Sequence, residues 1–323
     1  MRPSCYQGGP GGRLRSRKGG IFVGWALFKR DKMGAIIENR KDLLAKDISM
    51  KNWPLKFNFV GKERVISGAV MLLLLAIAFW FGPKALGSLL LIIYALFLDE
   101  LWSSFAQQKR WCKDYWAIMF GHLFLLFYCG LYGEFTFIHK FFLLAALMIN
   151  GVWLIYLFAF PLNRQKLVNL WKAHPVILSW FYLPAFISWG TLCQAGKAPF
   201  LGAVFLLVIL VDTGAWFVGK RWGKRPLWPS VSPHKTWEGL LGGVVIGTLG
   251  LIIYTLIFKE VKLPILGLIV LALAAQAGDL VESKIKRQFK LKDSSNLIPG
   301  HGGVYDRLDG LIFVVPFFIG LAL

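Results

Sequence analysis

The residue types best suited to chemistry gather in one polar stretch near the C-terminus, residues 283–309, between two apolar runs. It reads SKIKRQFKLKDSSNLIPGHGGVYDRLD and holds six Lys or Arg, three Asp and one His beside several glycines. Cations and flexible backbone suit phosphate, and carboxylates suit a divalent metal that bridges phosphates. The stretch therefore predicts a site that handles phosphate and metal.

Two further acids lie within apolar runs. Asp279 is near the end of the run that precedes the polar stretch, and Gln276, Glu282 and Ser283 lie at helical spacing from it, which gives one polar face. A carboxylate in hydrocarbon is costly, so Asp279 should face a polar cavity or a cation; the alternative is an acid that reaches interfacial water. Asp212, in VILVDTGAWFVGK, is a functional candidate for the same reason.

Asp306 and Asp309 are three residues apart at the start of the last apolar run. On a helix both point the same way, although acids are also favoured at helix starts for the dipole alone. Arg307 between them would pair with acids or with phosphate.

A glycine turn precedes these acids. His301, Gly302 and Gly303 follow Pro299 and Gly300, and such a turn lets backbone N–H groups approach an anion, although it also suits an ordinary loop. The cations nearby fit phosphate binding or the positive bias of a cytoplasmic loop. They are Lys286, Arg287, Lys290 and Lys292.

A second polar loop, residues 219–239, reads GKRWGKRPLWPSVSPHKTWEG. Ser232, Thr236 and Glu238 in it also fit the ordinary residue preferences of a helix start. Lys235 is the residue that those preferences explain least.

The elements that must position these residues are apolar segments long enough to cross a bilayer core of about 30 Å. Hydrophobic residues make up 56% of the 323 residues. We therefore expect an all-α polytopic integral membrane protein with about nine transmembrane helices, the last one starting within the DRLD stretch. The segments are 65–82, 85–101, 115–133, 141–161, 175–194, 199–219, 239–258, 264–282 and 310–323.

Charge placement predicts the orientation. With a cytoplasmic N-terminus and nine spans, 32 of the 37 Lys and Arg fall on the cytoplasmic side, in residues 1–64 and the loops at 102–114, 162–174, 220–238 and 283–309. This also accounts for the net charge of +20 without specific nucleic-acid binding. The predicted domains are a basic tail, 1–64, with an amphipathic segment at Met33–Lys46 suited to anionic lipid, and a transmembrane domain, 65–323.

The full pattern of residues 283–309 resembles the signature of phosphatidate cytidylyltransferases, also called CDP-diacylglycerol synthases. The matching positions are Ser283, Lys286-Arg287, Lys292-Asp293, His301-Gly302-Gly303 and Asp306-Arg307-Leu308-Asp309. SPHKTWEG in the second loop is similar to that family's SPKKTWEG box, with His234 in place of the usual Lys. The motifs and Asp212 cover roughly the last third of the chain.

The resemblance implies Mg²⁺-dependent transfer of CMP from CTP to phosphatidate, giving CDP-diacylglycerol and pyrophosphate. It implies Mg²⁺ on Asp279 and Asp306, with room for a second cation, and Asp309 and Asp293 as additional ligands. The remaining implied roles are in binding phosphate and substrate. Lys286, Arg287, Lys292 and Arg307 would bind phosphates. The substrate-binding residues would also include His301, Gly302 and Gly303 in the turn and Ser232, Lys235, Thr236 and Glu238 in the other loop.

CTP would arrive from the cytosol and phosphatidate from the bilayer lipid, which predicts an active site at the cytoplasmic interface, compatible with a bacterial inner membrane. A homodimer is left open. A CTP-dependent lipid-alcohol kinase would need similar contacts but would release no pyrophosphate, and the complete signature argues against it. An ion-coupled transporter would use Asp212 and Asp279 within spans, but the charges cluster at one membrane face instead of the midplane.

Overall fold

The computed structural model describes residues 62–132, 137–162, 165–194 and 196–322. Glu63–Leu323 form one compact unit. Nearly all of the predicted tail, including the amphipathic segment at Met33–Lys46, lies outside the described residues. The division of the chain at residue 64 therefore stays a prediction.

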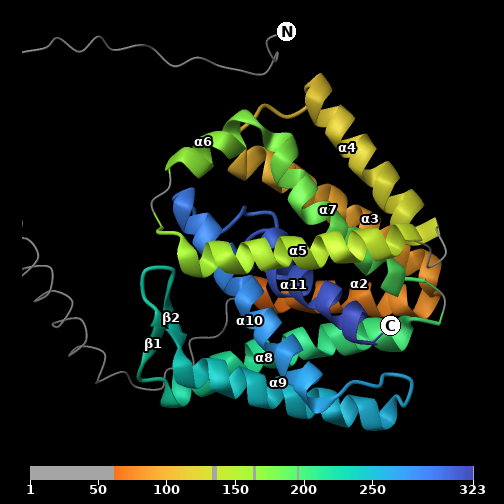
Figure 1. The fold of residues 1–323 in the computed structure, drawn as a ribbon, viewed down its shortest axis with the longest axis vertical. Coiled ribbons are helices and arrows are strands. Elements are labelled where there is room, and N and C mark those ends of the chain that lie inside the picture. Colours follow the sequence, from red (N-terminus) through yellow and green to blue (C-terminus); the bar gives the residue numbers. More distant parts are fainter. Residues whose placement is uncertain (1–61, 133–136, 163–164, 195, 323) are drawn as a thin grey trace, which may run out of the picture. The chain divides into compact units, whose positions relative to one another are not determined.

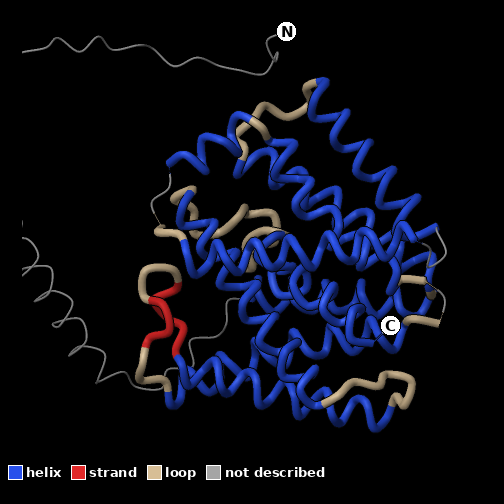
Figure 2. Tube along the Cα trace, viewed as in Figure 1, coloured by secondary structure: helices blue, strands red, loops and turns tan. Residues whose placement is uncertain are grey.

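Helices make up almost all of the described part of the chain (Figure 1), and Figure 2 shows one short strand pair at one end. An all-α architecture is thus confirmed, with a small hairpin in loop 220–238 and a short helix in loop 162–174 as additions that hydropathy did not reveal. The elements are α2 (Lys62–Phe81), α3 (Pro83–Glu100), π-helix η1 (Leu101–Phe105), α4 (Lys113–Leu125), π-helix η2 (Leu126–Tyr132), α5 (Phe137–Ala159), α6 (Gln165–Ala173), α7 (Pro175–Leu192), α8 (Ala198–Trp222), β1 (Pro226–Trp228), β2 (Ser232–Thr236), α9 (Trp237–Ile257), α10 (Ile265–Gln288) and α11 (Tyr305–Ala322).

Eight helices in the described ranges are long and apolar enough to cross a membrane. They coincide with the first eight predicted segments, so the chain is a polytopic integral membrane protein. The ninth segment is also helical, and it begins at Tyr305, within the DRLD stretch as expected. Its first turns carry Asp306, Arg307 and Asp309, so the start of α11 is polar and the rest is apolar.

Four polar segments that hydropathy places on the same membrane side, together with the start of α2, are connected to one another. Loop 102–114 is hydrogen-bonded to loop 162–174. An aromatic ring of loop 162–174 stacks on one in residues 283–309. Residues 283–309 in turn contact both loop 220–238 and α2. This gathering is what strict alternation of spans requires; which side faces the cytoplasm stays a prediction. The contacts are Gln108 Nε2 to Lys172 O at 2.8 Å, Trp171 to Phe289 at 5.4 Å between ring centroids, Arg287 Nε to Val231 O at 3.4 Å, and Ser67 Oγ to His301 Nδ1 at 2.7 Å.

Helix α10 stays helical six residues beyond its predicted end at 282, because its charged residues find partners. Lys284 is 1% exposed, and its Nζ donates to the carbonyl oxygens of Tyr156, Leu157 and Phe160 at 2.9, 2.7 and 2.6 Å. These carbonyls lie at the C-terminal end of α5, where a cation complements the unpaired carbonyls and the dipole. The bonds hold the polar end of α10 against α5.

Small residues bring α8 and α9 close together, and the two helices run side by side in Figure 1. On α9, Gly239, Gly243 and Gly247 recur every fourth residue and are buried. A Cβ at Gly243 would lie 2.7 Å from the backbone oxygen of Val211, and one at Gly247 would overlap the Val211 side chain. Close approach through glycine is the usual means of helix association in lipid.

Gly243→Ala should therefore lower the melting temperature of the purified protein in detergent, at a cost of about 1–3 kcal/mol of unfolding free energy, since the added methyl overpacks the α8–α9 contact. The matched control is Gly151→Ala in α5, where a Cβ would meet nothing within 4 Å. Equal melting temperatures for the two variants in a thermal-shift assay would show that α9 does not depend on this close contact.

Candidate active site

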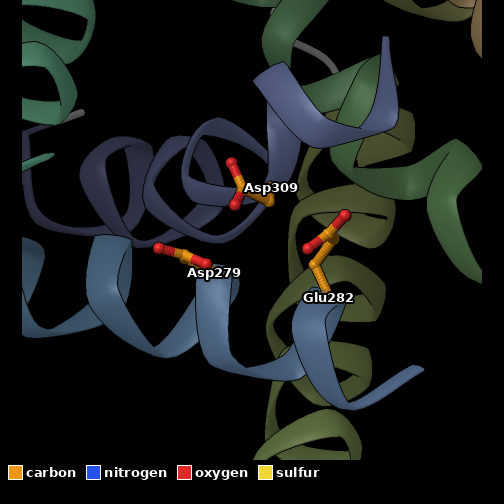
Figure 3. A group of neighbouring side chains, drawn as sticks. All are labelled: Asp279, Glu282 and Asp309. Carbon is orange, nitrogen blue, oxygen red and sulfur yellow. The ribbon is translucent and has the colours of Figure 1, made fainter. Parts of the chain in front are cut away.

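Three carboxylates from two helices converge near the polar end of the bundle. Asp279 and Glu282 lie one turn apart on α10, and Asp309 lies on α11; their ligand atoms are within 4.8 Å of one another. Figure 3 shows Asp309 facing the two α10 acids from the other helix. We call Asp279, Glu282 and Asp309 the acid triad.

The triad forms because α10 and α11 cross at glycines. A Cβ at Gly278 would overlap the backbone oxygen of Asp309, and one at Gly310 would lie 3.2 Å from the Val208 side chain and 3.6 Å from the backbone oxygen of Ala275. Each glycine is the sequence neighbour of a triad acid. The closest approach of the two backbones therefore falls where Asp279 and Asp309 project.

Two lysines balance part of this negative charge. Lys235, on β2, forms an ion pair with Asp279, and Lys286 bridges Glu282 at 2.7 Å and Asp306 at 2.6 Å. Glu282 is 2% exposed, and like charges at such separations are costly in a medium of low dielectric. A group of oxygen ligands with more acids than cations fits a hard divalent cation.

Asp306 has other partners. One of its oxygens accepts the Lys286 bond, and the other accepts the backbone N–H groups of Ser294 and Gly303 at 2.9 and 2.7 Å. These bonds tie two points of the loop between α10 and α11, one of them at its end, to the start of α11. The structure thus brings Asp309 and Glu282 to Asp279, and it places Asp306 one step away, across Lys286.

The start of α11 is anchored by Glu100, which sequence reasoning missed. This carboxylate, at the end of α3, is 2% exposed, and its Oε2 accepts the backbone N–H of Tyr305 at 2.7 Å. Its Oε1 occupies the space that a side chain at Gly303 would need. The Tyr305 hydroxyl lies 2.7 Å from that of Tyr182 on α7. The available signal was an acid at the end of an apolar segment that had no assigned role.

A pocket of about 450 Å³ opens beside Asp279, among α8, α9, α10 and β2; we call it the α8–α10 pocket. Asp212, the predicted intramembrane acid, lines it together with Lys235 and His234. The rest of the wall combines polar residues, Lys220, Thr236 and Gln276, with apolar ones that include Ala215, Trp216 and Leu240.

A second pocket, of about 520 Å³, lies at the glycine turn between α10 and α11; we call it the glycine-turn pocket. Lys292, Asp293, His301, Gly302 and Arg307 line it, all of them predicted site residues. Partial burial and the nearby Arg307 and Arg64 hold the pKa of His301 below its ordinary value, so the ring is neutral at pH 7. Arg307 Nε also donates to the His301 backbone oxygen at 3.2 Å.

The remaining predicted residues hold the surrounding loops. Thr236 caps α9, its Oγ1 accepting from the Gly239 N–H at 3.1 Å, and Glu238 accepts the N–H groups of Lys224 and Arg225 at 3.1 and 3.2 Å. The Arg287 guanidinium donates to the backbone oxygen of Leu291 at 3.0 Å. Ser232 begins β2, in the same short strand as Lys235.

Comparison with known proteins identifies the family of this chain. The cytidylyltransferase family matches residues 62–322, so the chain belongs to the cytidylyltransferase family. Similar proteins named phosphatidate cytidylyltransferase include one from Haemophilus influenzae, 33% identical over 80% of this chain and 96% of its own length. One from Bacillus subtilis is 48% identical over 33% of this chain and 40% of its own length, and one from Staphylococcus epidermidis is 45% identical over 35% of this chain and 44% of its own length.

Asp306→Asn should loosen the loop between α10 and α11, because charge-assisted bonds to a buried carboxylate contribute about 1.5–3 kcal/mol each. We expect faster trypsin cleavage after Lys290 and Lys292 in limited proteolysis. The control is Asp293→Asn, which makes the same change of charge in the same loop, where the acid is exposed. Equal cleavage rates would mean that Asp306 does not order the loop.

Proposed function

We propose that this protein transfers CMP from CTP to phosphatidate and forms CDP-diacylglycerol and pyrophosphate. The observation that carries the proposal is the acid triad, of which Asp279 lines the α8–α10 pocket, while Arg307, two residues before Asp309, lines the glycine-turn pocket. Two anionic substrates must meet in this reaction, and a site with one pocket for each, joined by a metal-binding group, suits that requirement.

The chemistry determines what the site must supply. An oxygen of the phosphatidate phosphate forms a new bond to the α-phosphorus of CTP, and the bond from that phosphorus to the bridging oxygen of the β-phosphate breaks. The electron pair leaves with pyrophosphate. Both reactants are anions, so catalysis rests on charge neutralisation and in-line positioning, with no nucleophile from the protein.

Asp279, Glu282 and Asp309 would hold Mg²⁺, which when bound neutralises phosphate charge and draws the reacting groups together. The oxygen-only ligand set and the excess of acids over lysines support this choice. It differs from the assignment made from sequence, in which Asp279 and Asp306 were the ligands and Asp309 and Asp293 were additional ones. A second cation, and roles for Asp306 and Asp293 in holding it, stay part of the proposal.

The cations near the triad have separate roles. Lys235 pairs with Asp279 and lines the α8–α10 pocket, so it is placed to turn from the carboxylate to a phosphate when substrate and metal bind. Lys292 and Arg307 line the other pocket, where they would stabilise the negative charge of the departing pyrophosphate. Lys286 keeps Glu282 and Asp306 in place.

Phosphatidate would enter the α8–α10 pocket sideways from the bilayer. Trp216, in the wall of this pocket, is 62% exposed. Leu241, the residue after Leu240 on α9, is 60% exposed. Such exposure suits side chains that face lipid. The site would then lie at the cytoplasmic interface of a bacterial inner membrane, with residues 1–64 as a basic tail near anionic lipid. A homodimer remains compatible with this arrangement.

The direct test incubates purified protein with CTP, Mg²⁺ and phosphatidate and measures CDP-diacylglycerol and pyrophosphate. Wild-type protein should form both in equal amounts, and Asp279→Asn should lower the rate by at least about a hundredfold while the protein stays folded. Asp114→Asn, an exposed acid on α4, is the control and should keep wild-type activity. A lipid monophosphate without pyrophosphate would instead identify a CTP-dependent kinase.

Glu282→Gln should raise the Mg²⁺ concentration needed for half-maximal rate by about ten- to a hundredfold, because it removes one charged ligand from the triad. A rate titration with Mg²⁺ measures this. Asp306→Asn serves as the comparison and should shift the midpoint less. If Asp306→Asn shifts the midpoint more than Glu282→Gln does, Asp306 is the ligand and Glu282 is not.

A further inference from the structure

Helix α2 is attached to the active-site loop chiefly through its first turns. Ala78 is the one α2 residue that is buried among those the structure describes. At the other end of the helix, Ser67 Oγ lies 2.9 Å from the Pro299 backbone oxygen and 2.7 Å from His301 Nδ1. Gly68 lies against the His301 ring. The start of α2 is thus fixed to the glycine turn.

Arg64, one turn before Ser67, forms part of the glycine-turn pocket together with Lys292 and Arg307. Its side chain lies over Gly300, where a Cβ would approach the Arg64 Cγ to 2.6 Å. Gly300 has a φ of +72°, so both its conformation and the close contact favour glycine. Sequence reasoning placed Arg64 in the basic tail, and neither signature motif includes it.

The three cations of this pocket are available for a ligand. Among the described residues, Arg64, Lys292 and Arg307 form no ion pair with an acid, whereas Lys235 and Lys286 both do. His301 is neutral, which leaves the positive charge of the pocket to these three side chains. They come from three different elements, α2, the loop and α11, and Asp293 is the single acid in the lining.

We propose that Arg64 is a substrate-binding residue that contacts the triphosphate of CTP in the glycine-turn pocket. The inference rests on the proposed function and assigns the two pockets: the apolar wall with Trp216 and Leu240 suits the lipid, and the pocket with three unpaired cations suits the polyphosphate. A guanidinium binds two phosphate oxygens at once, which fits a chain of phosphates. The start of α2 would therefore form one wall of the nucleotide-binding pocket.

The test compares Arg64→Ala and Arg64→Lys with wild-type protein in steady-state assays that vary each substrate separately. Arg64→Ala should raise the KM for CTP about ten- to a hundredfold and leave the KM for phosphatidate within about twofold, as expected for one lost charge-assisted contact. Arg64→Lys, which keeps the charge but not the fork, should fall between. Lys84→Ala, an exposed lysine in the first turn of α3, is the control and should change neither.

A binding titration of CTP without phosphatidate gives a readout that needs no turnover. The CTP dissociation constant should rise for Arg64→Ala by the same factor as the KM. An unchanged constant, a raised KM for phosphatidate instead, or an equal effect from Lys84→Ala would overturn the inference. If wild-type protein forms no CDP-diacylglycerol, the proposed function fails, but the titration still decides whether Arg64 binds the nucleotide.

Discussion

The arrangement of the site depends on how closely α10 and α11 approach. Gly278 lies against the backbone oxygen of Asp309, and this contact leaves no room for a side chain. Because Asp279 is the next residue after Gly278, the crossing point of the two helices fixes where both carboxylates meet. Their mutual repulsion is offset in part by Lys235 and Lys286 and would be offset further by a divalent cation. Packing in the membrane interior thus sets the charge density of the site.

Several contacts far apart in the sequence keep this crossing in place. Glu100 fixes the first residue of α11, Lys284 fixes the polar end of α10 to α5, and Asp306 closes the loop between the two helices. Each is a charged group that bonds backbone N–H or C=O groups at a helix end or in the loop. Unpaired backbone groups are costly in a surrounding of low dielectric, so these bonds stabilise the arrangement. Charged residues in this protein therefore also serve to hold the structure together.

The two pockets differ in a way that suits two substrates of different solubility. The α8–α10 pocket has a partly apolar wall next to exposed lipid-facing residues, and the glycine-turn pocket is lined by cations and turn backbone. Asp279 of the acid triad lines the first pocket, and Arg307, two residues before Asp309, lines the second. A reaction between a membrane lipid and a water-soluble nucleotide needs this kind of division, because neither substrate can leave its own phase completely.

Sequence alone determined the helical membrane architecture, the start of the last helix within DRLD, and the gathering of the polar loops. These follow from the length of apolar segments and from charge alternation, which are local properties that lipid enforces strictly. From sequence we also expected Asp279, as an acid within an apolar segment, and Asp309, Lys292 and Arg307, from the signature, to belong to the site. Tertiary structure alone decided which acids meet: Glu282 joins Asp279 and Asp309, while Asp306 turns to backbone N–H groups. It also placed Glu100 and Arg64 at the same loop, although both are more than two hundred residues away in the chain. Such long-range contacts depend on how the helices cross. A local sequence pattern does not determine that crossing.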